Sequence, residues 1–474
     1  MTHIRYIFLI SLLIRADGAK RSSELSRLLI ISLDGFRHEY LNQYEFPILN
    51  QFRNEGVQAT QGMKPTFTTM TFPNHISIAT GMYQEDHGIV HNSFFDRLLN
   101  RTIEMGNRDD GQWSDPNVEP IWITATKQNI KSAVLFWPAC HNKFHGIRPL
   151  IYSWSYTDDI PFREKIDNAI GYFRELPVQL VLLYHFEPDK QGHTYGPDSI
   201  EVHDTLVRLD GDIGYLLDRV QKDLGDDLNI IILSDHVSAN TSSDVNTFDD
   251  FKGMTNVTKV TRPFYEKYLN RSSVDSNILS GALFNVMPNS GNTEEVFNSL
   301  SKIPNVTVYK RDEMPERFHY SKPKHRLGEL TALTDTEGHI LSPATTNAAY
   351  PNKGNHGWDN AVKSMQAIFM ARGPLFSKSI QIDSLNNVDI YHIACHILKI
   401  NPNPYANAGS LANLTSLFAR IENTSTQTTF TSSNTTTARL TTELFFTTKS
   451  RAHCLCFSRH FLIALMFFVL SFTL

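Results

Sequence analysis

Cysteine is scarce in this sequence of 474 residues, which contains only four. Small exported modules that depend on disulfides carry many closely spaced cysteines, so the chain has no accessory module of that kind. Cys454 and Cys456 lie close to the C-terminus, in a segment that we do not expect to shape the core. No spacing motif relates the other two, Cys140 and Cys395, and the sequence leaves open whether they pair.

An excess of basic charge is also missing, because 44 Lys and Arg residues face 49 Asp and Glu residues and the net charge is −5. This balance argues against a basic surface for nucleic acid, and we expect no binding of nucleic-acid duplexes. The hydrophobic content of 41% is that of a globular protein, and the chain is long enough to bury a large core.

The N-terminus has the pattern of a secretory signal peptide over residues 1–19. Arg5 precedes an apolar run over residues 6–14, and small residues follow up to Ala19. Export is also indicated by eight Asn-x-Ser/Thr glycosylation acceptors outside the apolar runs. These acceptors are Asn100, Asn240, Asn256, Asn270, Asn305, Asn413, Asn423 and Asn434. We therefore expect the chain to enter the secretory pathway and its folded part to be extracellular.

The C-terminal end predicts attachment to a membrane at the cell surface. Residues 421–449 are rich in Thr and Ser, which is typical of a glycosylated stalk. Residues 450–474 contain the small residues Ser450 and Ala452, a spacer and an apolar tail over residues 461–474, which is the pattern of a lipid-anchor signal. The alternative is a transmembrane helix starting near Cys454, but the apolar tail is short for one and no basic segment follows it. We favour the lipid anchor.

Apolar runs of strand length recur along the chain without alternating polar residues. Such runs are typical of strands buried on both faces of a parallel sheet. The runs are Leu28–Leu33, Ser132–Trp137, Gln179–Tyr184, Asn229–Leu233 and Met365–Ala371, and Val202–Val220 between them has helical periodicity. We predict a layered α/β fold with a mainly parallel sheet over residues 25–420. A smaller inserted lobe is expected at about residues 237–351, with a strand near Ile278–Val286.

A helix start is predicted at Thr71, because Pro73 and then Ile76, Ile78 and Ala79 follow it. Unpaired N–H groups and the positive end of the helix dipole favour an anion there, so a hydroxyl at this point can face a phosphate. A Ser or Thr before a helix is usually only a cap, so a chemical role for Thr71 requires partners elsewhere in the chain.

Several possible metal ligands lie at the expected strand ends. Asp34 and the adjacent pair Asp235 and His236 directly follow apolar runs, and Asp189 comes shortly after a third run. Asp189 and His193 lie one turn apart if their segment is helical, and His356 lies in a loop flanked by glycines. Each residue alone has an ordinary structural explanation. Together the six suit two ions of the zinc type, with Thr71 as a further ligand.

Six segments resemble, in order, motifs of the ectonucleotide pyrophosphatase/phosphodiesterases of the alkaline phosphatase superfamily. They cover residues 31–37, 71–75, 87–92, 187–197, 234–236 and 354–360. The resemblance extends over residues 28–417 and implies an alkaline-phosphatase-like α/β/α sandwich. The chain is similar to the short members of the family, since it has neither Cys-rich N-terminal modules nor a nuclease-like C-terminal domain. It departs from the family pattern at Val237 and Ser238, and at Ala139 and Cys140 near the expected base pocket.

The resemblance implies a role for each site residue. One zinc ion would be bound by Asp189, His193 and His356, and the other by Asp34, Asp235, His236 and the oxygen of Thr71. Thr71 would be the nucleophile, and Asn92 and a backbone N–H near Thr71 would donate to the phosphoryl oxygen. Phe72 and Tyr156 would hold a nucleobase between their rings.

The sequence therefore predicts a cell-surface, zinc-dependent phosphodiesterase and nucleotide pyrophosphatase. It would convert extracellular nucleotides and dinucleotides to nucleoside 5′-monophosphates through a covalent threonyl intermediate. Two alternatives are a phosphodiesterase for choline-type lipid head groups and an inactive surface-binding protein on the same fold. A panel of nucleotide and choline substrates distinguishes the three.

Overall fold

The computed structural model describes residues 26–106, 110–113, 115–153, 160–237, 239–240, 268–275, 282–334 and 353–419. The predicted signal peptide, Tyr156, the stalk and the C-terminal segment lie outside the described residues. Among the helices that are described, none is both long and apolar enough to cross a membrane.

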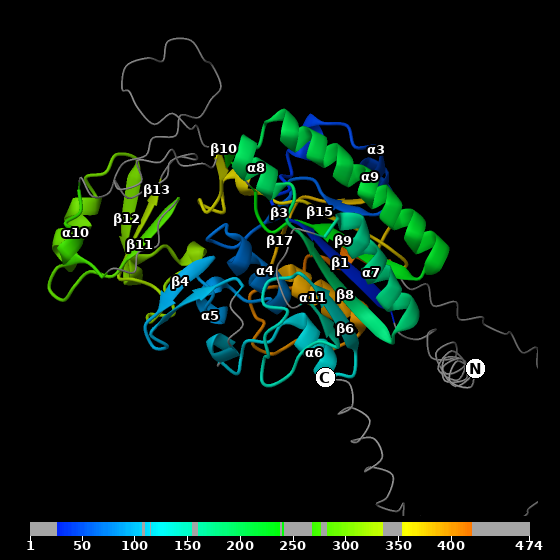
Figure 1. The fold of residues 1–474 in the computed structure, drawn as a ribbon, viewed down its shortest axis with the longest axis horizontal. Coiled ribbons are helices and arrows are strands. Elements are labelled where there is room, and N and C mark those ends of the chain that lie inside the picture. The colour runs from blue at the N-terminus through cyan, green and yellow to red at the C-terminus, as the bar shows by residue number, and fades with distance from the viewer. Residues whose placement is uncertain are drawn as a thin grey trace, which may run out of the picture. The chain divides into compact units, whose positions relative to one another are not determined.

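A central sheet of eight strands organises the described part of the chain (Figure 1). In spatial order the strands are β16 (Ile380–Ile382), β2 (Val57–Ala59), β15 (Phe369–Arg372), β9 (Leu228–Leu233), β1 (Arg27–Leu33), β8 (Val178–His185), β6 (Lys131–Leu135) and β7 (Ile151–Tyr152). Neighbouring strands are parallel except where β15 pairs with β2 and with β9. The predicted mainly parallel sheet is confirmed.

Helices cover both faces of this sheet, so the fold is the expected α/β/α sandwich (Figure 1). One layer contains α3 (Pro47–Glu55), α7 (Phe162–Glu175) and α9 (Ile200–Asp223), with α8 (Asp189–Tyr195) packed on α9. The other contains α4 (Thr71–Thr80), α6 (Ile121–Lys127) and α11 (Asp389–Leu398). Strands β1, β8 and β9 are almost completely buried between these layers, which explains why their sequences are continuously apolar.

Two predicted strands have different bounds in the structure. Strand β6 ends at Leu135 rather than at Trp137, because Phe136 has a left-handed φ of 61° that breaks the extended conformation. Strand β15 begins at Phe369 rather than at Met365, because Lys363–Met365 forms a short 3-10 helix. The predicted helix Val202–Val220 lies within α9, which is longer because the Ser199 side chain caps its start.

A second, three-stranded antiparallel sheet lies within the region predicted as an inserted lobe. It consists of β11 (Leu283–Val286), β13 (Leu330–Thr334) and β12 (Val306–Lys310), with α10 (Thr293–Leu300) beside it. Its apolar side chains form a separate small cluster, which includes Phe284, Val296 and Leu300. The sequence indicated one strand here, and the structure adds β12 and β13.

The remaining described elements are short. They are α2 (Tyr40–Gln43), α5 (Gln84–His87), the strand pairs β3 (Met63–Lys64) with β17 (Leu385–Asn386), β4 (Ser93–Asp96) with β5 (Arg101–Glu104) and β10 (Ala239–Asn240) with β14 (Gly354–Asn355), and 3-10 helices at Asp110–Trp113, Arg271–Ser273, Arg311–Glu313, Glu316–Phe318, Lys363–Met365 and Thr415–Leu417. Cys140 and Cys395 are both buried and both are free thiols, so the open question of their pairing is answered: they form no disulfide.

Candidate active site

The three predicted aspartates meet at the carboxyl ends of three adjacent strands. Asp34 follows β1, Asp235 follows β9, and Asp189 starts α8 just after β8. The Asp189 N–H donates to the Asp34 carbonyl over 3.0 Å, which ties two of these strand ends together. Gly35 between them has a φ of 71°, and a Cβ atom there would lie 2.6 Å from Cβ of Asp189. Only glycine allows this close approach.

Asp34 and Asp235 each have one oxygen held by the protein and one oxygen turned into the site. The Tyr184 hydroxyl donates to Oδ2 of Asp34 over 2.5 Å, and the Gly35 N–H donates to Oδ1 of Asp235 over 3.4 Å. Oδ1 of Asp34 and Oδ2 of Asp235 are buried and accept no hydrogen bond. They lie 3.3 Å and 3.1 Å from Nε2 of His236. This is the arrangement expected of carboxylates that offer one oxygen each to a cation.

His193 and His356 are oriented by backbone carbonyls. Nδ1 of His193 donates to the Gly354 carbonyl over 2.7 Å, and Nδ1 of His356 donates to the Thr69 carbonyl over 3.0 Å. Because a carbonyl only accepts, Nδ1 of each ring carries a proton, and Nε2 presents a lone pair whenever the ring is neutral. Metal-binding imidazoles are typically oriented in this way by a second hydrogen bond.

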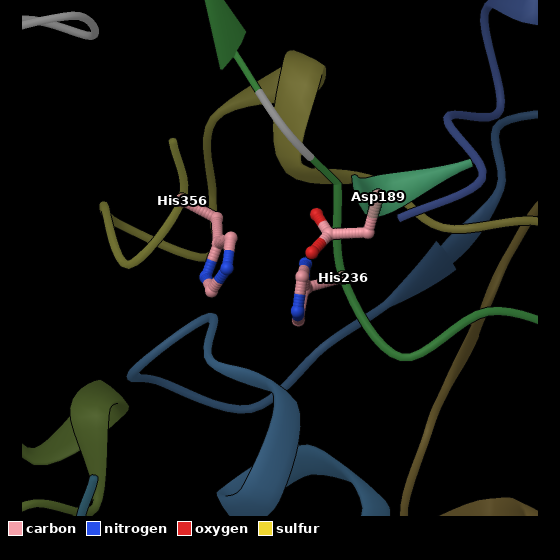
Figure 2. A group of neighbouring side chains, drawn as sticks. All are labelled: Asp189, His236 and His356. Atoms are coloured by element: carbon pink, nitrogen blue, oxygen red, sulfur yellow. The ribbon is translucent and has the colours of Figure 1, made fainter. Parts of the chain in front are cut away.

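Within the described part of the chain, two groups of three side chains are close enough to hold a metal ion. The first is Asp34, Asp235 and His236, which matches one predicted ion site. The second is Asp189, His236 and His356, which converge from three separate segments (Figure 2). Within each group, the possible ligand atoms lie within 4.8 Å of one another. His236 therefore lies between the two groups, stacked on His356 at 3.8 Å between ring centroids.

His193, predicted as a ligand beside Asp189 and His356, is not part of the second group. Its Nε2 lies 3.2 Å from Oδ2 of Asp189, at the edge of the cluster. The predicted helical spacing is confirmed, because both residues lie on α8. The structure thus brings His193 next to Asp189, while His236 occupies the more central position.

Burial and neighbouring charges shift the pKa of all three carboxyl groups. Burial, followed by the charges of Asp235 and Asp189, raises the pKa of Asp34 well above its usual value, and burial raises the pKa of Asp235 to about 7. Burial opposes ionisation of Asp189 too, but His193 and then His356 lower its pKa below the usual value. Asp34 and Asp235, each with one unpartnered oxygen, need positive charge nearby in order to ionise. The donor set, carboxylate and imidazole, suits zinc-type ions.

Thr71 lies beside this cluster at the start of α4, as predicted. Its side chain does not cap the helix, because the N-cap residue is Met70. Instead, Oγ1 of Thr71 lies 2.9 Å from Nε2 of His236. The side chain is 5% exposed, so its hydroxyl is shielded from bulk water yet next to the cluster. Its position is that of a group poised to meet an anion at the helix start.

Asn92 lies next to the start of α4 and binds a backbone N–H of its first turn. Oδ1 of Asn92 accepts from the Phe72 N–H over 2.8 Å. This hydrogen bond engages the Phe72 N–H and leaves the NH₂ group of the Asn92 amide as its donor side. The Phe72 ring is 0% exposed and makes an edge contact with Trp113, so a nucleobase reaches it only after neighbouring side chains move.

The sequence did not reveal the residues that support the site through hydrogen bonds to Asp34 and Thr71. Tyr184, the donor to Asp34, belongs to an apolar strand and gave no signal of its own. His75 donates through Nδ1 to the Thr71 carbonyl over 2.8 Å, and its Nε2 accepts from the Ser32 hydroxyl over 2.9 Å. Its presence four residues after Thr71 on a helix was the available signal.

Comparisons with known proteins identify the family of the chain. Residues 28–359 match the family model "Type I phosphodiesterase / nucleotide pyrophosphatase". Human bis(5′-adenosyl)-triphosphatase ENPP4 is 35% identical over 405 residues, which cover 84% of this chain and 84% of that protein. Human ectonucleotide pyrophosphatase/phosphodiesterase family member 5 is 32% identical over 388 residues, covering 80% of this chain and 76% of that protein.

Solved structures of murine family member 5 are similar as well. An inactive threonine-to-alanine variant of that protein, in complex with AMP, is 30% identical with a TM-score of 0.74 and covers 83% of this chain and 100% of its own. The fold is therefore the alkaline-phosphatase-like fold that the sequence implied. The chain belongs to the type I phosphodiesterase/nucleotide pyrophosphatase family, and it is a hydrolase and a single-catalytic-domain member of the ectonucleotide pyrophosphatase/phosphodiesterases.

Proposed function

We propose that the protein hydrolyses extracellular nucleotides and dinucleotides to nucleoside 5′-monophosphates, with two zinc ions and with Thr71 as the nucleophile. The observation that carries the proposal is the 2.9 Å approach of the Thr71 hydroxyl to His236, at the centre of the two candidate metal groups. A relative named as a bis(5′-adenosyl)-triphosphatase and a structural neighbour in complex with AMP support a nucleotide substrate.

The residues present fit the two ions. Asp34, Asp235 and His236 would hold one ion, and Asp189 and His356 the other, with His193 as its third ligand. The unpartnered oxygens of Asp34 and Asp235 and the carbonyl-oriented ring of His356 are the donors this requires. The ions would supply the positive charge that offsets the negative charge of a phosphodiester during attack.

Thr71 would act in two displacements. In the first, its Oγ1 forms a bond to phosphorus while the bond to the leaving group breaks, which leaves a nucleotidyl-threonine. In the second, water attacks the same phosphorus, releases the nucleoside 5′-monophosphate and restores the hydroxyl. His75 holds the Thr71 carbonyl throughout, and this contact fixes the start of α4 beneath the reacting group. Two in-line displacements give net retention at phosphorus.

Substrate binding would use residues near the helix start. The Asn92 amide, fixed by the Phe72 N–H, would donate to a phosphoryl oxygen through its NH₂ group. Phe72 and Tyr156 would hold the base, with Phe72 becoming accessible as the pocket opens. The C-terminal segment would attach the protein to the cell surface. Release of the protein from cells by a phosphatidylinositol-specific phospholipase would distinguish a lipid anchor from a transmembrane helix.

A substrate panel tests this function. Zinc-loaded protein is incubated with ATP, diadenosine triphosphate and glycerophosphocholine, and products are separated by chromatography. We expect AMP from the first two substrates, and no activity after thorough chelation until zinc is restored. Cleavage of the choline diester alone would identify a head-group phosphodiesterase, and failure to cleave any of them would indicate a binding protein.

A further inference from the structure

Thr69 joins two loops that carry different parts of the candidate site. It lies between β3 and α4, two positions before Thr71. Its hydroxyl and its carbonyl both form hydrogen bonds with residues 354–358, which contain His356 and which we call the His356 loop. Thr69 and His356 are 287 positions apart in the sequence. Because the Thr69 side chain is 0% exposed, water does not compete for these contacts.

Three hydrogen bonds connect Thr69 to three successive residues of the His356 loop. The Thr69 carbonyl accepts from Nδ1 of His356 over 3.0 Å. The Thr69 hydroxyl accepts from the Gly357 N–H over 2.9 Å and donates to the Trp358 carbonyl over 3.1 Å. Sδ of Met365 lies 3.4 Å from the same hydroxyl and is a weaker acceptor than a carbonyl. One side chain therefore binds both a donor and an acceptor of the loop backbone.

The two loops also approach each other closely beside Thr69. Gly357 has a φ of 110°, and a Cβ atom there would lie 3.0 Å from Sδ of Met70. Glycine is the residue that adopts this φ readily and leaves room for Met70. On its other side the loop is held by Trp358, whose Nε1 donates to the Thr334 hydroxyl over 2.9 Å. The His356 loop is thus fixed in position against the segment that leads into α4.

The His356 loop orients two of the imidazoles of the site. It supplies His356 itself, and its Gly354 carbonyl accepts from Nδ1 of His193 over 2.7 Å. Asp34 and Asp235 depend on other elements, because they follow the central strands β1 and β9. A displacement of the loop would therefore move His193 and His356 while the two carboxylates keep their places at the strand ends.

We propose that the Thr69 hydroxyl is a positioning group, which fixes the His356 loop and thereby sets the affinity of the ion site formed by Asp189, His193 and His356. The inference rests on the proposed two-ion site and adds to it a residue that acts only through the loop. Loss of a group that supports metal ligands typically lowers metal affinity 10–100-fold. Because Thr69 also leads into α4, it ties this ion site to the position of the Thr71 hydroxyl.

Zinc binding by Thr69→Val tests the proposal. Valine has nearly the shape of threonine but lacks the hydroxyl, so the buried Gly357 N–H loses its partner. Zinc content is measured by atomic emission, and both affinities are measured by competition with a chelating dye. We expect the wild type to bind two ions, and Thr69→Val to bind one with unchanged affinity and the other at least tenfold more weakly. Thr69→Ser restores the hydroxyl and should bind both ions like the wild type.

Two further variants complete the test. Thr80→Val makes the same change at the other end of α4, where the buried Thr80 hydroxyl donates to the Ile76 carbonyl over 2.7 Å, and it should bind both ions like the wild type. Thr69→Ala removes the same hydroxyl with a smaller side chain, and it serves if Thr69→Val does not fold.

The outcomes separate this inference from the proposed function. Wild-type affinity for both ions in the folded Thr69 variant, equal weakening of both ions, or the same loss in Thr80→Val would overturn the positioning role and leave the proposed function standing. A wild type that binds fewer than two zinc ions would overturn the proposed two-ion site and this inference with it.

Discussion

The Thr71 hydroxyl and the His236 imidazole meet at 2.9 Å although 165 positions separate the two residues in the sequence. Thr71 begins α4 on one side of the sheet, and His236 follows β9 at the carboxyl edge. Their contact joins the predicted nucleophile to the predicted metal ligands. The most direct test of the proposed chemistry therefore acts on Thr71 itself.

Replacement of Thr71 by Ala should lower kcat by about three orders of magnitude or more, because the attacking oxygen is lost. Thr71→Ser should retain measurable activity, because the oxygen survives. Zinc content, measured by atomic emission, should stay close to two ions per chain in both variants, since the carboxylate and imidazole donors are intact. Near wild-type turnover by Thr71→Ala would show that water is the direct nucleophile.

Replacement of Tyr184 by Phe should lower zinc affinity or activity by about 10–100-fold, which is typical when the partner of a metal ligand is removed. The change deletes the 2.5 Å hydrogen bond to Oδ2 of Asp34 and leaves the buried ring in place. Tyr215→Phe is the matched control, because its hydroxyl donates to Asp167 between α9 and α7, and neither residue belongs to the candidate site. Equal activity of Tyr184→Phe and Tyr215→Phe would contradict a role for Tyr184 in holding Asp34.

Metal-free protein should lose stability as the pH rises from about 6.5 to about 9. Burial lowers the pKa of His193, but the charge of Asp189 together with the hydrogen bonds to Asp189 and Gly354 outweighs burial and raises the pKa to about 9. In this pH range the unfolded chain has released the His193 proton while the folded chain still binds it, so stability falls with rising pH. Urea unfolding at pH 6.5 and 9 measures the difference. His193→Gln should show a smaller fall, and an equal fall in both proteins would exclude His193 as its source.

Cys140 and Cys395 should resist thiol reagents in the folded protein. Burial raises the pKa of each thiol to about 12, so thiolate is scarce at neutral pH. Alkylation followed by peptide mapping should label both residues only after unfolding. A peptide in which the two are linked before reduction would contradict the finding that both are free.

The positions of the buried strands and of the candidate site residues along the chain could be predicted from the sequence. Apolar strands are buried on both faces and therefore lack alternation, so β1, β8 and β9 were recognisable, and with them the positions of Asp34 and Asp235 at strand ends. Local rules also placed Thr71 at a helix start and Asp189 and His193 one turn apart.

Other features could not be read because they depend on contacts between distant segments. The antiparallel direction of β15 is set by its pairing with β2 and β9, not by its own apolar residues. The same holds for the hydrogen bond that joins the Phe72 N–H of α4 to Asn92, which lies just before β4.

The sequence by itself determined which residue types are available to the site and that they follow the strands of one sheet. Only the tertiary structure decided which atom of each residue faces the centre. The Tyr184 hydroxyl donates to one oxygen of Asp34, and the Gly35 N–H donates to one oxygen of Asp235. The other oxygen of each carboxylate is thereby left for an ion. His236 came to lie between the two metal groups because β9 is adjacent to β1 in the sheet. Local periodicity carries no information about which strands become neighbours in the sheet, because that depends on the packing of the whole core.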